Sequence, residues 1–352
     1  MGIKRLNNFL QIKDVLKYHK NISDYIRSLK TDGYKCFNTR NDKFVIGVDL
    51  LLYAHKYKYS CDNIYIGFIN QILNFLSNKI VPIYIIDGIA PQEKQDVIQS
   101  RLNKKNKIFQ KIENLEEEKN NLDKNDENID KINNEIEKLN KNNITVHSYE
   151  IEKLIELFNI FNIPYIRAQN EADTLISKLY KKKIINACLS EDMDLLVFGC
   201  RKMIKFSSNV VVEYDLDHIL KNLNLNNNEF IELCILFGCD YLKPLLRLKP
   251  EEIYNKYKSI NNIENMFDDN DYYNSEIIDK YLIEYNNTKN IFINGDDNED
   301  INNIKINLAP IDINKLNNFI KNNYINQTND NNNINYQISH INELIKNRKF
   351  GI

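Results

Sequence analysis

Three features are missing from this 352-residue sequence: a long apolar run, a close pair of cysteines and an appreciable net charge. No stretch approaches the ~18 apolar residues that a membrane span needs. The first segment, MGIKRLNNFLQIK, lacks the apolar core of a signal peptide. Gly2 alone would permit myristoylation, but Leu6 stands where that signal requires Ser or Thr. We therefore expect an intracellular protein without a membrane partner.

The cysteines never form a CxxC pair and sit in largely apolar surroundings. They are Cys36, Cys61, Cys188, Cys200, Cys234 and Cys239. Close cysteine pairs are typical of zinc sites, and disulfides are rare inside cells. We therefore expect reduced thiols and no zinc site.

The charges of the chain nearly cancel, with 47 Lys and Arg against 49 Asp and Glu and a formal net charge of −2. This balance provides no overall attraction to phosphate, so bulk charge alone does not indicate a nucleic-acid-binding protein. The chain is 43% hydrophobic and 27% charged. That is enough apolar material for a core, which excludes wholesale disorder.

Four short runs have the composition of β-strands, at residues 44–48, 81–86, 184–189 and 210–212. The first three lead to acidic residues, namely Asp49, Asp87, and the pair Asp192 and Asp194. Helical spacing of apolar residues lies between them, as at residues 64–76. Apolar strands that alternate with helices predict an α/β fold with a buried parallel sheet. The fourth run is expected to form a hairpin with residues 203–206, across residues 207–209.

Residues 101–143 are dominated by charged residues and Asn, with sparse Ile and Leu at three- and four-residue spacing. This pattern predicts two charged helices that meet near residues 123–128, and composition alone favours a solvated hairpin. Beyond residue 240 the chain is helical and then rich in Asn. We expect an exposed loop at residues 294–303, helices at 310–322 and 338–347, and a mobile segment at 326–335.

The acidic residues at the strand ends are expected to converge, because ligands of a parallel sheet bind outside the carboxyl ends of its strands. Asp192 and Asp194 are two residues apart, so in an extended segment they project to the same side. Glu171 and Asp173 follow Asn170, a plausible N-cap, and open a helix. Asp240 follows an apolar helix that Gly238 is expected to end.

Carboxylates crowded together repel each other and require cations. Oxygen ligands without His or Cys suit Mg²⁺ or Mn²⁺ rather than zinc. A cluster of this size suggests two ions roughly 4 Å apart, which activate a water and stabilise a leaving oxygen in phosphodiester hydrolysis. The alternative is a set of separate helix caps and surface charges.

Two cations follow the second strand, Lys94 and Arg101, after Gly88 and Pro91. Their spacing of seven residues places both on one helix face, from which they could hold the scissile phosphate. The alternative is an ordinary solvated helix face.

These segments resemble, in order, the motifs of the flap endonuclease and XPG-type family of structure-specific 5′ nucleases. The matching segments are MGIKRL at residues 1–6, Val48-Asp49, Ile86-Asp87-Gly88 with Pro91, Lys94 and Arg101, IPYIRAQNEAD at 163–173, SEDMDLLVFG at 190–199, and LFGCDY at 236–241. The resemblance covers most of residues 1–260 and includes all seven metal-binding carboxylates of the family.

The resemblance implies a PIN-like α/β fold, with a mostly parallel twisted sheet flanked by helices. It implies an N-terminal nuclease region at residues 1–100, a helical gateway or arch at 101–148, an internal nuclease region at 149–240, and a helical DNA-binding and C-terminal extension at 241–352. A single-stranded 5′ end passes through such an arch, so Lys104, Lys105 and Lys107 near its base are candidate DNA contacts.

The resemblance also implies roles for the candidate site residues, with two Mg²⁺ ions for which Mn²⁺ substitutes. Asp49, Asp87, Glu171 and Asp173 would hold the ion at the attacking water, and Asp192, Asp194 and Asp240 would serve the second. Lys94 and Arg101 match the basic pair that steers the phosphate.

The sequence departs from the family after Asp240-Tyr241. The glycine-containing G-x-G-P turn, whose backbone grips duplex phosphate, is replaced by Arg247-Leu248-Lys249-Pro250. Duplex binding is therefore expected to use the side chains of Arg247 and Lys249. No sliding-clamp peptide of the form QxxLxxFF is recognisable. The missing glycines, the missing clamp peptide and the Asn-rich composition resemble a divergent, poxvirus-like member from a large DNA virus. Such a member would act in the host cytoplasm, whereas a cellular member would act in the nucleus.

The function implied is a Mg²⁺-dependent 5′ nuclease for branched, flapped, nicked or gapped DNA in replication, recombination and repair, with other replication proteins as partners. One alternative is an inactive scaffold of the same fold that binds DNA junctions, but none of the seven carboxylates is degenerate. The other alternative is a 5′-to-3′ RNA exonuclease, although the residues within the motifs favour a DNA substrate.

Overall fold

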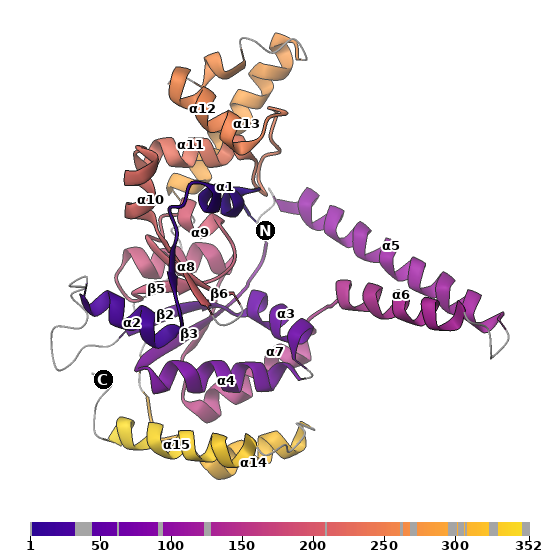
Figure 1. Ribbon diagram of the computed structural model, residues 1–352, viewed down its shortest axis with the longest axis vertical. Coiled ribbons are helices and arrows are strands. Elements are labelled where there is room, and N and C mark those ends of the chain that lie inside the picture. Colours follow the sequence, from indigo (N-terminus) through magenta and orange to yellow (C-terminus); the bar gives the residue numbers. More distant parts are fainter. Residues whose placement is uncertain are drawn as a thin grey trace.

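The computed structural model describes residues 2–31, 44–61, 63–90, 94–122, 128–207, 210–260, 263–267, 273–294, 301, 306, 308–323 and 330–346. A central sheet with helices on both sides forms the body, and a long helical hairpin projects from it (Figure 1). Pro91, residues 123–127, most of the expected 294–303 loop and the expected turn at Ser208 and Asn209 lie outside the described residues.

The sheet has seven strands in the order β1-β7-β6-β5-β2-β3-β4. The strands are β1 (Lys17–His19), β2 (Phe44–Asp49), β3 (Ile80–Ile86), β4 (Tyr165–Arg167), β5 (Ala187–Leu189), β6 (Lys202–Ser207) and β7 (Val210–Asp215). The five strands from β6 to β4 are parallel, while β7 is antiparallel to both β6 and β1. The predicted parallel sheet and the β6–β7 pairing are confirmed.

Strand β5 is shorter than the expected run of 184–189. Lys183 adopts the left-handed conformation, with φ 60°. The backbone N–H groups of Ile184 and Ile185 then bond back to the carbonyl of Leu179, which closes the preceding helix. The strand can begin only after that turn, where Asn186 N–H donates to the carbonyl of Val45 at 2.7 Å.

Helices cover both faces of the sheet, with α8 and α9 on one side and α3, α4 and α7 on the other (Figure 1). The helices of the body are α1 (Leu6–Ile12), α2 (Ile22–Thr31), α3 (Leu50–Ser60), α4 (Ile64–Ser77), α7 (Ser148–Phe161), α8 (Ala172–Lys181), α9 (Asp194–Val197), α10 (Leu216–Leu223), α11 (Asn227–Phe237), α12 (Pro250–Ile260), the 3-10 helix η3 (Glu264–Phe267), α13 (Ser275–Asn294), α14 (Ile313–Asn322) and α15 (Asp330–Lys346). Among the described residues, no helix is long and apolar enough to span a membrane.

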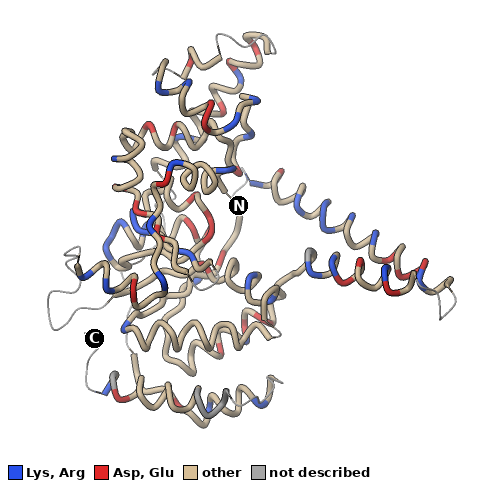
Figure 2. Tube along the Cα trace, in the orientation of Figure 1, with Lys and Arg blue, Asp and Glu red and all other residues tan. Residues whose placement is uncertain are grey.

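The projecting hairpin consists of α5 (Gln95–Asn120) and α6 (Asn128–Asn142). At 1.5 Å per residue, α5 is about 39 Å long. The two helices touch through a thin apolar seam that buries Ile112 and Ile132 and through an ion pair of 2.6 Å between Lys111 and Glu135. Basic residues follow the part of α5 next to the body and acidic residues gather toward its far end (Figure 2). The predicted pair of charged helices is confirmed.

The C-terminal helices pack beneath the body, with α15 against α4 and α14 against α7. The expected helix at 310–322 appears as α14. The prediction of a mobile segment at 326–335 is wrong for residues 330–335, because α15 already begins at Asp330. The reason is a stripe of buried apolar residues, Ile334, Ile338 and Ile341, whose spacing favours a helix before and after residue 338.

Cys188 and Cys200 form a disulfide, so the prediction that all cysteines are reduced is wrong. The two residues are twelve apart in sequence, but β5 and the start of β6 are neighbours in the sheet and bring them together. Both are fully buried. Cys61, Cys234 and Cys239 are free thiols, and Cys36 lies outside the described residues.

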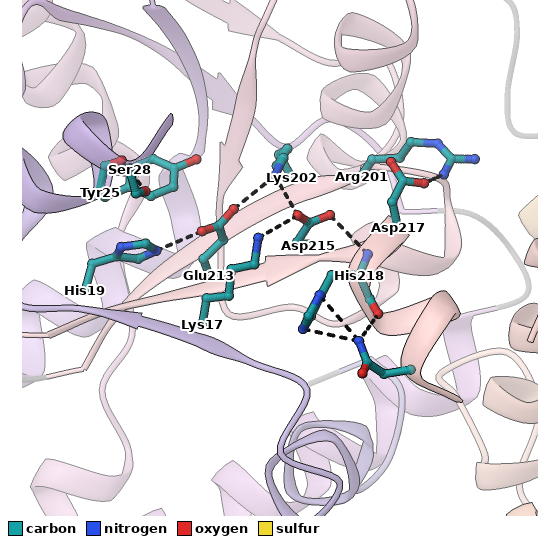
Figure 3. A network of polar contacts seen from close by, with 11 residues as sticks. Lys17, His19, Tyr25, Ser28, Arg201, Lys202, Glu213, Asp215, Asp217 and His218 are labelled. Atoms are coloured by element: carbon teal, nitrogen blue, oxygen red, sulfur yellow. Dashed lines mark hydrogen bonds and ion pairs between the residues drawn. The ribbon is translucent and has the colours of Figure 1, made fainter. Parts of the chain in front are cut away.

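A buried polar network attaches the edge strand β1 to β7 and β6 (Figure 3). The imidazole Nε2 of His19 lies 2.8 Å from a carboxylate oxygen of Glu213. The ammonium of Lys202 donates to both Glu213, at 3.1 Å, and Asp215, at 2.8 Å. Lys17 donates to Asp215 at 3.1 Å. The charges on β6 and β7 are therefore balanced by residues of β1.

Candidate metal and phosphate site

A cavity of about 490 Å³ lies at the carboxyl edge of the parallel strands, beneath the base of α5. Six of the seven predicted carboxylates line it: Asp49, Asp87, Glu171, Asp173, Asp192 and Asp240. Asp194 lies behind them and is fully buried. The structure thus brings together side chains that are up to 191 residues apart in the sequence.

A close approach of backbone segments sets Asp87 beside the start of α8. The N–H of Gly88 donates to the carbonyl of Asn170 at 2.6 Å. A Cβ at Gly88 would lie 2.2 Å from the carbonyl oxygen of Ala168, so only glycine fits. The Asp87 carboxylate then accepts from the N–H of Ala172 at 2.8 Å.

The helix cap predicted at Asn170 is therefore wrong. The N-cap position of α8 belongs to Glu171, whose side chain makes no capping bond. The carboxylate of Asp87, from the end of another strand, satisfies the first helical N–H instead. This leaves the side chain of Glu171 available to the cavity.

Asp192 and Asp194 do not lie in an extended segment as predicted. Ser190 Oγ accepts from the N–H of Asp192 at 3.0 Å, and Asp192 Oδ1 accepts from the N–H of Asp194 at 3.1 Å. These bonds form a tight turn that starts α9 at Asp194. Gly2 packs directly on the turn, since a Cβ there would lie 1.9 Å from Asp192 Oδ1.

Burial and mutual repulsion raise the pKa of most carboxylates in the cluster. Burial, then the charge of Asp87, raises the pKa of Asp49 to about 7. Burial raises the pKa of Asp173 and of Asp194 well above the usual value, and in both the charge of Asp192 adds to the effect. The cluster therefore favours either protons or added positive charge.

Lys94 supplies positive charge inside the cluster. Its ammonium lies 2.8 Å from Glu171 Oε1 and 4.0 Å from Asp194 Oδ2. It also lies 4.6 Å from the centre of the Tyr241 ring, and the Tyr241 hydroxyl donates to Glu171 Oε2 at 3.0 Å. Burial opposes the charge of Lys94, but Glu171 and then Asp194 outweigh it and raise its pKa to about 12.

The other predicted cations divide into three groups. Arg101 lines the cavity and donates to Asp240 Oδ2 at 2.6 Å, and Lys105 lines it from the next turn of α5. Lys104 and Lys107 line other cavities on α5. Arg247 and Lys249 are exposed before α12, and neither lines this cavity.

Sequence reasoning missed two residues of the site. His55 lines the cavity from α3, and burial together with the charges of Lys105 and Lys58 lowers its pKa. No sequence signal distinguished it from other helical residues. Tyr241 was within a quoted motif, but its contact with Glu171 depends on how α8 meets the chain after α11.

The donor set of the cavity fits divalent cations in its chemistry. All of its acidic ligands are carboxylates, as Mg²⁺ and Mn²⁺ prefer. Oδ1 of Asp173 and both carboxylate oxygens of Asp194 are buried without a hydrogen-bond partner in the described part of the chain. With the side chains as placed, no three His, Cys, Asp or Glu residues among those described are grouped to hold one ion. An ion bound by Glu171 would compete with the ammonium of Lys94 for that carboxylate.

This chain is similar in sequence to known endonucleases. Residues 162–240 match the XPG I-region. The chain is 28% identical over 211 residues to flap endonuclease 1 of Enterocytozoon bieneusi, covering 57% of this chain and 56% of that protein. It is 26% identical over 307 residues to a probable RAD2-like endonuclease of Invertebrate iridescent virus 6, covering 71% of this chain and 74% of that protein. These similarities support a divergent member of the XPG and flap endonuclease family.

Solved structures share the fold of this chain. The catalytic core of Rad2 in complex with DNA substrate has a TM-score of 0.66 and 18% identity, covering 96% of this chain and 100% of that chain. Flap endonuclease-1 from Methanococcus jannaschii has a TM-score of 0.60 and 18% identity, covering 88% of this chain and 96% of that chain. The predicted resemblance and the PIN-like fold are confirmed.

The segment that matches the XPG I-region includes five of the seven cluster carboxylates: Glu171, Asp173, Asp192, Asp194 and Asp240. Asp49, Asp87, Lys94 and Arg101 lie before it in the sequence and reach the same cavity. The chain spans about half the length of the E. bieneusi flap endonuclease that it matches.

Proposed function

We propose that this chain is a metal-dependent, structure-specific 5′ nuclease that hydrolyses phosphodiester bonds in DNA. The observation that carries the proposal is the cavity in which six carboxylates face Lys94 and Arg101. Excess negative charge suits divalent cations, and the adjacent basic side chains suit a phosphate. A cluster of capping and surface carboxylates would not need to be buried around one cavity.

Nucleases of this family depend on metal ions, and we assign two Mg²⁺ ions to this site, replaceable by Mn²⁺. Asp49, Asp87, Glu171 and Asp173 would hold the first ion, and Asp192, Asp194 and Asp240 the second. Bound there, the ions would supply an activated water and stabilise the negative charge of the reacting phosphate.

Lys94 and Arg101 bind and orient the phosphate. With its pKa raised to about 12, Lys94 keeps its proton at any physiological pH. Lys94 is paired with Glu171, and Arg101 is paired with Asp240. Both carboxylates are proposed ion ligands. Cations on those carboxylates would weaken the two ion pairs and free both basic groups for phosphate oxygens.

The expected substrates are branched, flapped, nicked or gapped DNA. Solved relatives of this fold hold DNA, including Rad2 with a DNA substrate and human GEN1 with Holliday junction DNA. The hairpin of α5 and α6 projects beside the cavity and carries basic residues at its base (Figure 2). A single-stranded 5′ end that passes this hairpin reaches Lys94 and Arg101.

The test is cleavage of end-labelled 5′-flap, gapped, nicked and single-stranded DNA with Mg²⁺ or Mn²⁺. We expect cleavage near the branch point and loss of at least 10³-fold in rate for Asp192→Ala. Asp217→Ala, a surface change distant from the cavity, is the control. Absence of cleavage by the unaltered protein, or full activity of Asp192→Ala, would contradict the proposal.

The same experiment separates the alternatives. Tight binding of branched DNA without turnover in either metal would support an inactive scaffold of this fold. Faster cleavage of an RNA version of the same substrate would support an RNA exonuclease. The complete set of carboxylates around the cavity favours turnover.

A further inference from the structure

Two aromatic side chains stand on the surface where the projecting hairpin returns to the body. They are His147 and Tyr149, at the start of α7 and directly after the connection from α6. Their ring centres lie 5.6 Å apart and their planes differ by 11°, so the rings are stacked with an offset. Tyr149 is 60% exposed, and His147 is exposed as well. We name this pair the aromatic shelf.

The aromatic shelf differs from the other aromatic contacts of the protein. Each of the other ring pairs in the described part of the chain contains a buried ring. The nearby Val146 and Ile151 pack against the core, whereas the rings of His147 and Tyr149 stay at the surface. An offset pair of exposed rings leaves aromatic surface on which a third planar group can stack.

The backbone beneath the aromatic shelf is held from two sides. The N–H of His147 donates to the carboxylate of Glu150 at 2.8 Å, and this buried carboxylate pairs with Lys58 of α3 at 2.7 Å. The ammonium of Lys58 also donates to the carbonyl of Thr145 at 2.7 Å. From α5, Lys105 donates to Thr145 Oγ1 at 3.1 Å. Because the segment is already fixed, a ligand on the shelf would not have to order it.

The aromatic shelf lies close to the carboxylate cavity along the chain. Ile144 lines the cavity, and His147 follows three residues later on a connection that passes beside α3 (Figure 1). Three residues of extended chain span at most about 11 Å. At about 3.4 Å per nucleotide, roughly three stacked nucleotides cover the same distance. A strand that leaves the cavity on this side therefore reaches the shelf within a few nucleotides.

We propose that the aromatic shelf binds unpaired bases of the single-stranded 5′ part of the DNA by stacking, a few nucleotides from the carboxylate cavity. This inference rests on the proposed nuclease function. Every base has an aromatic face, so stacking on His147 and Tyr149 would hold a single strand of any sequence. Bases within a duplex are already stacked on one another, so the shelf favours an unpaired end over a paired one.

The experiment removes the Tyr149 ring and, separately, the bases that it would contact. Binding of labelled 5′-flap DNA is measured with Ca²⁺ in place of Mg²⁺, with a flap long enough to reach the shelf. A second substrate has an abasic flap of the same length, which keeps every phosphate. For Tyr149→Ala we expect roughly tenfold weaker binding of the ordinary flap, the loss of about one stacked base. On the abasic flap, the variant and the unaltered protein should bind equally.

Two further variants control for the ring and for exposure. Tyr149→Phe keeps the ring without its hydroxyl and should bind the ordinary flap like the unaltered protein. Tyr18→Ala removes a tyrosine of similar exposure, 56%, from β1 at the edge of the sheet and should leave binding unchanged. Because no charge is lost, the salt dependence of binding should be the same for Tyr149→Ala and the unaltered protein.

Unchanged binding of the ordinary flap by Tyr149→Ala, with thermal unfolding like that of the unaltered protein, would overturn the proposal. An equal loss on the abasic flap would also overturn it, because the ring would then act on something other than bases. Cleavage is measured in parallel with Mg²⁺. Cleavage by the unaltered protein without a base-dependent defect in Tyr149→Ala rejects the shelf alone, whereas a base-dependent defect without any cleavage rejects the nuclease function alone.

Discussion

The ammonium of Lys94 and the carboxylate of Glu171 form an ion pair of 2.8 Å that joins the N-terminus of α5 to the N-terminus of α8. Side-chain exposure is only 10% for Lys94 and 16% for Glu171. The pair ties the base of the projecting hairpin to the carboxylate cluster. Lys94 therefore belongs both to the start of the hairpin and to the charge balance of the site.

Removal of the Lys94 ammonium is expected to slow the chemical step more than it weakens binding. For Lys94→Ala we expect a single-turnover cleavage rate lower by about 10²- to 10³-fold, because a buried cation next to the reacting phosphate stabilises charge that develops in the transition state. The dissociation constant for flap DNA in Ca²⁺ is expected to change by less than about tenfold. Lys315→Ala is the control, and equal losses in rate and affinity would assign Lys94 to ground-state binding.

Neutralisation of Asp49 is expected to stabilise the metal-free protein at alkaline pH. The Asp49 carboxyl has a folded-state pKa of about 7, raised by burial and Asp87 from 3.8. The stability that this group contributes is complete below the unfolded pKa and is lost as the pH rises through 7. Asp49→Asn should raise the free energy of unfolding by about 2 to 4 kcal/mol at pH 8 in EDTA.

The same variant provides its own control at low pH. At pH 4 the Asp49 carboxyl of the folded protein is protonated, so the effect of Asp49→Asn should nearly vanish. Asn also accepts the helix-capping bond that Asp49 receives from Leu52 N–H. Urea unfolding measures the effect of Asp49→Asn on the free energy of unfolding at each of the two pH values. An equal effect at pH 4 and pH 8 would contradict the assigned pKa.

The network at the sheet edge is expected to stabilise the fold in a pH-dependent way (Figure 3). Burial raises the pKa of Asp215, but its bonds with Lys202 and Lys17 outweigh burial and lower the pKa below 3.8. The stability that this pairing contributes is present above pH 3.8, and it is lost as the pH falls through the lower pKa that Asp215 has in the folded protein. Lys202→Met should cost about 3 kcal/mol at pH 7 and much less near pH 3.

Urea unfolding at both pH values tests that expectation. Lys221→Met, an exposed change on α10, is the control. A loss of stability that is the same at pH 7 and pH 3 would mean that Lys202 acts through packing rather than through its charge.

The disulfide between Cys188 and Cys200 encloses the turn that carries Asp192 and Asp194. Cross-linking a loop of this size restricts the unfolded chain, and its reduction should lower the free energy of unfolding by about 2 to 3 kcal/mol. Intact-mass measurement after alkylation in denaturant, with and without a reductant, counts the two thiols released. Release of no additional thiols on reduction would show that the pair is not oxidised.

The amino-acid sequence by itself determined the parallel sheet, the long charged hairpin and the set of carboxylates. These depend on local patterns: apolar runs such as residues 81–86 form buried strands, and an acidic residue after each strand must lie at the same edge. Family motifs added Glu171, Asp173 and Asp240, whose local surroundings are those of ordinary helix termini.

Only the tertiary structure decided which groups meet. Asp87, not Asn170, caps α8, because Gly88 allows two backbone segments to touch. Cys188 and Cys200 pair because β5 and β6 are neighbours. The N–H of Lys4 donates to the carbonyl of Gly238, 234 residues away. Such contacts arise when distant elements pack, and no local periodicity encodes them, so the sequence specified the chemistry of this site while packing specified its geometry.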